Sequence, residues 1–224
     1  KRTRIIKSGR NAGAKMVVFV LEDLQGSAEV VLWPDVLSKF ADRLIEDTRA
    51  GYVTLLGRPN AGKSTLMNAL IGETLSIVTP KAQTTWQRIT GLLTTSDTQM
   101  IFLDTPGLLA PKDLLQRCML AAAKEALAEA DVVLLTVDGS RGWNSEDRER
   151  TTSVLAGGPD VPLLVAINKS DLISRQEADS LAALVSQDLG GESFLVCARD
   201  SRGVDAIRLR LEDLLPPGPF LYPP

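Results

Sequence analysis

A glycine-rich octapeptide constrains the fold of this chain more than any other feature. Residues 57–64 read G-R-P-N-A-G-K-S, between an apolar run at 52–56 that is typical of a strand and a helical pattern at 63–71. Glycine lets the backbone curl so that successive N–H groups face one point, and the helix adds its positive end. This pattern predicts a phosphate-binding loop, or P-loop, that joins a strand to a helix.

The P-loop supplies most of the predicted contacts to a nucleotide. We expect Lys63 to reach the β- and γ-phosphates and to act in catalysis, and the Ser64 hydroxyl to bind Mg²⁺. The other expected nucleotide contacts in this segment are Gly57, Asn60, Ala61, Gly62 and Thr65.

A second motif, Asp104-Thr105-Pro106-Gly107, follows an expected strand at 100–103, about 40 residues after the P-loop. A carboxylate at the end of this strand can reach a metal, so Asp104 is a candidate for both nucleotide and Mg²⁺ binding. The Gly107 N–H can meet the γ-phosphate, which gives this residue a catalytic role. D-x-x-G alone is a common turn, and its distance from the P-loop favours the functional interpretation.

A third motif, Asn168-Lys169-Ser170-Asp171, follows a buried apolar run at 163–167 and predicts which base is bound. The Asp171 carboxylate can accept hydrogen bonds from the N1–H and the exocyclic amine of guanine, which adenine does not offer. Asn168 can serve N7 and tie neighbouring loops together, and the Lys169 stem can lie over the ring. With the two preceding motifs in order, these residues indicate a guanine-nucleotide site.

The segment between the first two motifs, residues 79–86, is polar and without periodicity, which predicts a mobile loop. A threonine hydroxyl here can complete the Mg²⁺ shell only when a γ-phosphate is present, and so act as a switch. Thr85 is the first candidate for this metal-binding and catalytic role, and Thr84 is the second. The alternative is that both are plain loop threonines.

The rest of the chain alternates strands and helices, which predicts an α/β fold with a mostly parallel sheet covered on both faces. Expected strands lie at 52–56, 89–93, 100–103, 132–137, 163–167 and 194–197, and expected helices at 63–71, 113–130, 176–189 and 204–215. The chain has no histidine, which excludes imidazole catalysis and histidine-bound metals. Cys118 and Cys197 are far apart, as in a reduced cytoplasmic protein, and no apolar run approaches the length of a membrane span.

Together, GRPNAGKSTLMNAL, KAQTT, DTPGLL and NKSD resemble the Era-type GTPases of bacteria, over about residues 49–224. The resemblance implies a Ras-like P-loop G domain with six strands at residues 48–216, GTP hydrolysis with Mg²⁺, and GTP and GDP as ligands. It also implies a cytoplasmic role in assembly of the small ribosomal subunit and its rRNA, with peripheral membrane association as a further option. Family members carry an RNA-binding KH domain after the G domain, so residues 217–224 are expected to be a linker toward a domain that this sequence does not include.

Several positions depart from the family pattern. Trp86 replaces an arginine, and the last guanine loop reads Cys197-Ala198-Arg199, from which we expect the Ala198 N–H to contact guanine O6. Leu108 and Leu109 stand where Ras-like proteins place a water-orienting glutamine, so intrinsic turnover should be slow. Asn60 either helps to hold K⁺ beside the phosphates, compensating for that glutamine, or only braces the loop.

Residues 1–47 resemble part of the OB-fold of the bacterial DNA polymerase III alpha subunit, with expected strands at 16–21 and 28–33 and a helix after Pro34. This segment is either a genuine fusion or the product of a chimeric reading frame. Its first 15 residues hold six basic side chains and no acid, which favours weak contact with single-stranded nucleic acid or a plain solvated edge. Two alternative functions therefore stay open: a nucleic-acid-binding module linked to replication, and a GTP-binding scaffold that does not hydrolyse.

Overall fold

The chain folds as two compact units, Lys1–Asp47 and Thr48–Pro224. The computed structural model describes residues 2–5, 15–23, 26–32, 48–72, 89–108 and 113–222. For the first unit, the structure describes the path of the backbone.

The first unit contains a three-stranded antiparallel sheet in the order β1-β2-β3. Its strands are β1 (Arg2–Ile5), β2 (Lys15–Asp23) and β3 (Gly26–Leu32), and the pairing of β2 with β3 extends to Asp23 opposite Gly26. The two strands predicted from the apolar runs are confirmed. The helix predicted after Pro34 lies outside the described residues, and the relation to an OB-fold stays a prediction.

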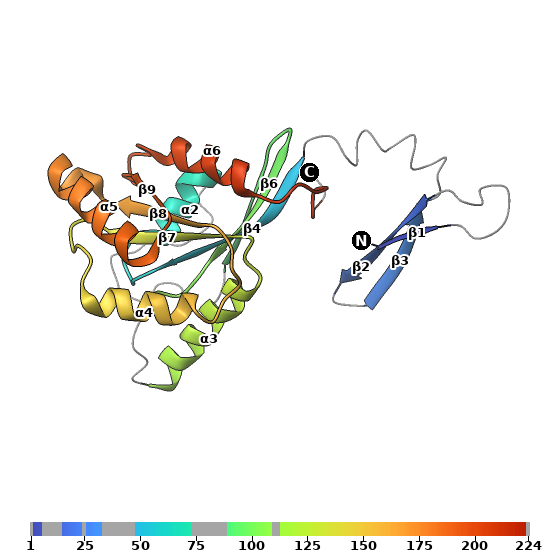
Figure 1. The fold of residues 1–224 in the computed structure, drawn as a ribbon, viewed down its shortest axis with the longest axis horizontal. Coiled ribbons are helices and arrows are strands. Elements are labelled where there is room, and N and C mark those ends of the chain that lie inside the picture. The colour runs from blue at the N-terminus through green and yellow to red at the C-terminus, as the bar shows by residue number, and fades with distance from the viewer. Residues whose placement is uncertain are drawn as a thin grey trace. The chain divides into compact units, whose positions relative to one another are not determined.

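The second unit is built on a six-stranded sheet in the order β5-β6-β4-β7-β8-β9, drawn in Figure 1. Only β5 runs antiparallel to its neighbour among these strands, so the predicted, mostly parallel six-stranded sheet of a Ras-like α/β fold is confirmed. The strands are β4 (Arg49–Gly57), β5 (Ile89–Thr94), β6 (Thr98–Asp104), β7 (Val132–Asp138), β8 (Leu163–Asn168) and β9 (Glu192–Leu195). The helices are α2 (Lys63–Ile71), α3 (Leu114–Ala128), α4 (Ser145–Leu155), α5 (Arg175–Leu189), α6 (Val204–Leu214) and the short 3₁₀ helix η1 (Ser170–Leu172).

Two apolar layers fill the space between the sheet and its helices. On one face α2 and α6 pack against the strands through residues such as Leu66, Met67 and Ile207. On the other face α3, α4 and α5 do the same through residues such as Leu127, Val154 and Val185 (Figure 1). The central strands β6 and β7 are buried along their whole length, as expected for strands covered on both sides.

Among the described helices of eight or more residues, α4 is the one that the sequence pattern did not predict. Its sequence, SEDRERTTSVL, is mostly polar and buries only Asp147, Thr151 and Val154, so it shows little apolar periodicity. The helix is instead fixed at its start by a capping box: Asn144 accepts from the backbone N–H of Asp147, whose side chain accepts from the N–H of Asn144. That N-x-x-D pattern was the available sign of a helix start.

Residues 216–222 pack against the rest of the second unit. The Gly218 N–H donates to the Thr48 carbonyl at 2.9 Å, and the side-chain oxygen of the buried Gln99 accepts from the N–H groups of Leu221 and Tyr222, each at 2.8 Å. Segment 217–222, expected as a linker, is therefore tied to β4 and β6.

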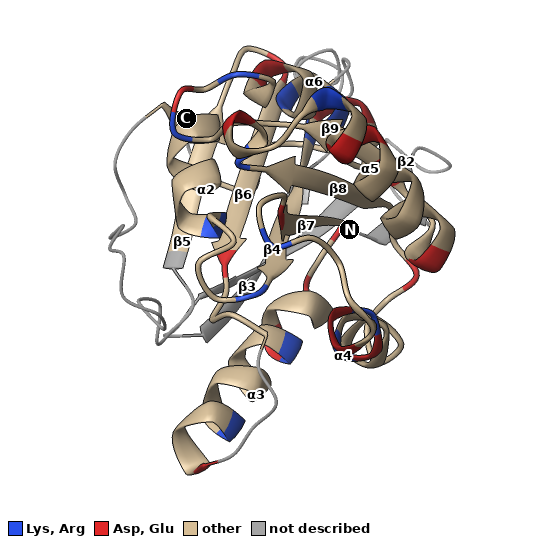
Figure 2. Cartoon of the chain, turned by 90° about the vertical axis from the view of Figure 1, so that its left-hand side faces the viewer, with Lys and Arg blue, Asp and Glu red and all other residues tan. Residues whose placement is uncertain are grey.

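Figure 2 shows acidic and basic residues interspersed over α4, α5 and α6. No helix in the described part of the chain is both long and apolar enough to cross a membrane.

Candidate nucleotide-binding site

The P-loop lies at the carboxyl end of β4, and its conformation requires glycine at two positions. Gly57 has φ +143°, and a Cβ there would lie 2.3 Å from the carbonyl oxygen of Thr136 on β7. Gly62 has φ +97°, precedes α2, and a Cβ there would lie 2.2 Å from Nδ2 of Asn168. The loop therefore sits closely against the neighbouring strands, with the N-terminus of α2 at its end.

Lys63 is the first residue of α2 and is buried, with only 6% of its surface exposed. Its Nζ donates to the carbonyl oxygens of Gly57 at 3.3 Å and Arg58 at 3.2 Å. Burial lowers the pKa of Lys63 to about 8, although the nearby Asp104 carboxylate opposes this shift. The buried Lys63 ammonium, held by these two carbonyl oxygens, is placed to bind an anion.

Ser64 and Asp104 come together from different elements. The Ser64 Oγ donates to Oδ2 of Asp104 at 2.5 Å, and Asp104 is fully buried at the end of β6. Hydroxyl and carboxylate oxygens are the ligands that Mg²⁺ prefers, usually together with water and substrate phosphates. The donor set of these two residues therefore fits Mg²⁺.

The segment after Asp104 runs directly beside the P-loop. The Thr105 hydroxyl donates to the Leu55 carbonyl at 2.6 Å, and the Leu108 N–H donates to the Gly57 carbonyl at 2.9 Å. A Cβ at Gly107 would lie 2.4 Å from the backbone nitrogen of Pro59, so this glycine permits close approach. Leu108 is buried in the core and carries no hydrogen-bonding group in its side chain.

Asn168 joins two loops of the site. Its Nδ2 donates to the carbonyl of Ala61 in the P-loop at 2.9 Å, and its Oδ1 accepts from the N–H of Ala198 at 3.0 Å. The Ala198 N–H expected to meet guanine O6 is thus engaged with Asn168 in this structure. The same side chain fixes the P-loop and the 197–199 loop relative to each other.

Asp171 borders a pocket of about 190 Å³. Its two carboxylate oxygens accept from the Cys197 Sγ at 3.1 Å and from Nη2 of Arg199 at 3.2 Å. Burial and the contact with Asp171 raise the pKa of the Cys197 thiol, so it stays protonated and acts as a donor. The pocket is lined by Gly62, Thr65, Asn168, Lys169, Asp171, Leu172, Cys197, Ala198 and Arg199.

Lys169 forms an ion pair that the sequence did not predict. Its backbone has φ +61°, and its Nζ donates to Oδ2 of Asp138 at 2.6 Å. Burial raises the pKa of Asp138, but hydrogen bonds from Lys169 and Ser140 outweigh it, so the pKa lies below its ordinary value. The sign in the sequence was an aspartate directly after the apolar run 132–137, the same position that Asp104 takes on β6.

The structure thus brings most of the predicted residues to one edge of the sheet, at the carboxyl ends of β4, β6 and β8. This edge is where ligands bind in open α/β sheets. Asn60 lies in the loop with an exposed side chain and φ +61°. The candidate switch residues Thr84 and Thr85, with Trp86 and Leu109, lie outside the described residues.

Comparison with known proteins places this site in a family. GTPase Era of Bradyrhizobium diazoefficiens is 38% identical over 179 residues, covering 79% of this chain and 57% of the relative. GTPase Era of Dinoroseobacter shibae is 42% identical over 182 residues, covering 79% and 58%. The chain therefore spans well under two thirds of the length of these relatives.

Solved structures show the same likeness. The crystal structure of Era in complex with MgGDPNP and nucleotides 1506–1542 of 16S ribosomal RNA has a TM-score of 0.75 and 36% identity, covering 79% of this chain and 60% of that chain. An Aquifex aeolicus Era variant bound to GDP·AlF4⁻ has a TM-score of 0.74 and 35% identity over the same shares. The expected resemblance to the G domain of Era is confirmed. A model of the 50S ribosome-binding GTPase family matches residues 52–169, and the chain belongs to that family.

Proposed function

We propose that this chain binds GTP and hydrolyses it to GDP and phosphate. The observation that carries the proposal is the convergence of three separate motifs on one edge of the sheet. Asn168 connects the P-loop to the base-side loop, and the Ser64–Asp104 contact connects the P-loop to the D-x-x-G segment. Phosphate, metal and base functions thus come from residues held in direct contact.

The phosphate end depends on charge stabilisation by fixed groups. Lys63 would keep its two carbonyl partners and use the third N–H of its ammonium to donate to a phosphate oxygen, and the Gly107 N–H would donate to the γ-phosphate. Ser64 and Asp104 would hold Mg²⁺, joined by Thr85 when the γ-phosphate is present; the bound ion supplies charge neutralisation on the phosphates. The chain offers no evident general base, so catalysis rests on positioning and electrostatics.

The base end selects guanine. Asp171 would accept from the N1–H and the exocyclic amine, in place of its present donor Arg199, while the Lys169 stem would lie on the ring. Asp138 would position Lys169 by its ion pair. The loop with Cys197, Ala198 and Arg199 would close the pocket around the base.

A potassium ion is the second cofactor of the proposal. Asn60 is exposed on the P-loop at φ +61°, so its amide oxygen would be accessible to an ion beside the phosphates. K⁺ held there would offset negative charge in the transition state, in a site where Leu108 gives no water-orienting group. The alternative, a role in bracing the loop, predicts equal turnover in KCl and NaCl. The potassium role requires faster turnover in KCl, with a much smaller difference in Asn60→Ala.

The test of the proposed hydrolysis is phosphate release from GTP with Mg²⁺, with ATP as the comparison. Lys63→Ala should abolish tight GTP binding measured by calorimetry, because it removes the buried cation. Tight binding of GTP without phosphate release would support the scaffold alternative. Normal GTP binding by Lys63→Ala would contradict the P-loop assignment.

We propose the small ribosomal subunit and its rRNA as the partner of the larger activity. The support is the solved Era structure, which is a complex with nucleotides 1506–1542 of 16S ribosomal RNA. A cytoplasmic location agrees with the free thiols of Cys118 and Cys197, and peripheral membrane association would be a secondary property. Binding to ribosomal subunits in the GTP and GDP states, measured by co-sedimentation, tests the partner; equal absence of binding in both states would contradict it.

Residues 1–47 have a second candidate function, contact with single-stranded nucleic acid as an OB-like module. What supports it is the antiparallel three-stranded sheet, whose first strand carries Arg2 and Arg4 in register with Val18 and Met16 of β2. Binding of a labelled oligonucleotide should weaken steeply with salt. Unchanged binding after Arg2 and Arg4 are both replaced by Ala would count against this function.

A further inference from the structure

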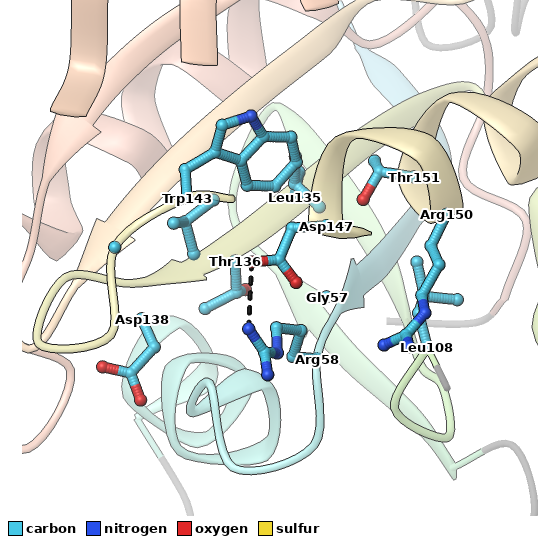
Figure 3. A pocket seen from close by; sticks show the side chains of 12 residues that line it. Gly57, Arg58, Leu108, Leu135, Thr136, Asp138, Trp143, Asp147, Arg150 and Thr151 are labelled. Atoms are coloured by element: carbon cyan, nitrogen blue, oxygen red, sulfur yellow. Dashed lines mark hydrogen bonds and ion pairs between the residues drawn. The ribbon is translucent and has the colours of Figure 1, made fainter. Parts of the chain in front are cut away.

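A small cavity lies beside the P-loop, separate from the base pocket. Figure 3 shows it between the start of the P-loop, the end of β7 and the first turn of α4. The space available to the centre of a water-sized molecule is about 20 Å³. The residues that matter here are Arg58, Thr136 and Asp147, which approach it from these three elements.

An ion pair connects the P-loop to α4 across this cavity. Nη1 of Arg58 donates to Oδ2 of Asp147 at 2.9 Å, the contact drawn as a dashed line in Figure 3. The Asp147 side chain is 1% exposed and that of Arg58 is 31% exposed. A carboxylate this deeply buried requires a partner charge, and the P-loop arginine is that charge.

The same stretch of the P-loop holds Lys63. The carbonyl oxygens of Gly57 and Arg58 are the two acceptors for the Lys63 Nζ. Gly57 is paired with Thr136 in the β4–β7 ladder, so Thr136 fixes one side of this stretch while Asp147 fixes the other. A displacement of Arg58 would therefore move an acceptor of the lysine that faces the phosphates.

Two buried oxygens at the cavity are without a partner among the described residues: Oδ1 of Asp147 and Oγ1 of Thr136. Asp147 is 2% exposed and Thr136 is 1% exposed, so bulk water does not reach them. Leaving such buried groups without a hydrogen-bond partner destabilises the folded protein. A cavity of this volume exceeds the roughly 10–15 Å³ that one water needs, and the residues that carry these two oxygens line it.

We propose that Asp147 is a positioning residue of the nucleotide site: it sets the P-loop through Arg58, and one ordered water shared with Thr136 completes its hydrogen bonds. The inference rests on the proposed function and adds a residue that lies outside the nucleotide-binding motifs. With its second oxygen held by water, the Asp147 carboxylate keeps its orientation toward Arg58. The first turn of α4 then determines where the Lys63 acceptors stand.

The test compares Asp147→Asn with Asn144→Ala. Both variants weaken the capping of α4, but only the first removes the charge that holds Arg58; the second leaves the Arg58–Asp147 pair in place. GDP affinity by calorimetry should fall about tenfold in Asp147→Asn, the coupling expected for contacting residues. Asn144→Ala should lower the melting temperature and keep GDP affinity near that of the wild type.

Arg58→Met provides the reciprocal test from a partly exposed position. The double variant Arg58→Met/Asp147→Asn should bind GDP with the affinity of whichever single variant binds it less tightly, because both changes break the same ion pair. For the water, Thr136→Val should weaken GDP binding, whereas Thr136→Ser, which keeps the hydroxyl, should not.

Wild-type GDP affinity in Asp147→Asn and Arg58→Met, or an equal loss in Asn144→Ala, would overturn the positioning role. Equal affinities for Thr136→Val and Thr136→Ser would overturn the role of the shared water. A wild-type chain that binds no guanine nucleotide would overturn the proposed function and this inference with it, so the two failures are distinguished by the wild-type measurement.

Discussion

Raising the pH from 7 to 8.5 should weaken GDP binding through one group, Lys63. Burial lowers the pKa of Lys63 to about 8 in the empty protein, so it loses its proton within this range. A bound diphosphate favours the charged ammonium and raises that pKa again. Binding at pH 8.5 must therefore be accompanied by proton uptake.

The magnitude follows from the pKa of about 8. At pH 8.5 roughly three quarters of the empty protein has lost the Lys63 proton, against about a tenth at pH 7. If only the protonated form binds tightly, GDP affinity falls about fourfold between these pH values, with uptake of roughly three quarters of a proton per GDP at pH 8.5. This pH still leaves the N1–H of guanine in place for Asp171.

Calorimetry in two buffers of different ionisation enthalpy measures the proton uptake directly. Lys63→Arg is the matched control, since a guanidinium keeps its proton throughout this range and should show no pH-dependent uptake. The same pKa shift predicts that the empty wild type becomes more stable as pH rises from about 8 toward 10.5, because the unfolded chain then binds more protons than the folded one. GDP affinity and proton uptake that stay constant from pH 7 to 8.5 would refute the reasoning.

Three further predictions concern single residues. Asp171→Asn should shift preference from GTP to XTP, at a cost to GTP of about 2–4 kcal/mol in calorimetry; equal GTP affinity would contradict the guanine assignment. Ser64→Ala should reduce Mg²⁺-dependent binding and turnover more than binding in EDTA, and an equal loss in both conditions would argue against its metal role. Gly57→Ala should lower the melting temperature and weaken GDP binding, because its Cβ would meet the Thr136 carbonyl at 2.3 Å; unchanged behaviour would refute the need for glycine there.

In the described part of the chain, the six-stranded sheet and four of the five helices of eight or more residues could be predicted from the sequence because their apolar patterns are strong. Runs such as 132–137 are continuous and bounded by turn residues, and α2 begins inside the P-loop motif, at Lys63. Helix α4 was not predicted because tertiary contacts and a capping box, rather than an apolar stripe, stabilise it. Because α4 is mostly polar, its sequence gives no sign of the role of Asp147. That role depends on a contact with Arg58, 89 residues away in the chain.

The nucleotide motifs were readable because each is a local pattern at the end of a strand. The interactions between them were not, since Asn168 meets Ala61 across 107 residues of sequence. The Ala198 N–H also illustrates this: its present acceptor, the Asn168 side chain, is set by how β8 and the following loops pack. Asp138 was overlooked because a single aspartate after a strand carries no motif of its own.

Phosphate release from GTP in Mg²⁺ and KCl, followed for the wild type and Lys63→Ala in parallel with ATP, tests the central claim most directly. The account predicts slow release from GTP by the wild type, on the order of 10⁻⁴ s⁻¹ in the absence of an activator. It predicts no release above background from ATP, and none from GTP with Lys63→Ala. Equal rates with GTP and ATP, or a rate that survives Lys63→Ala, would contradict it.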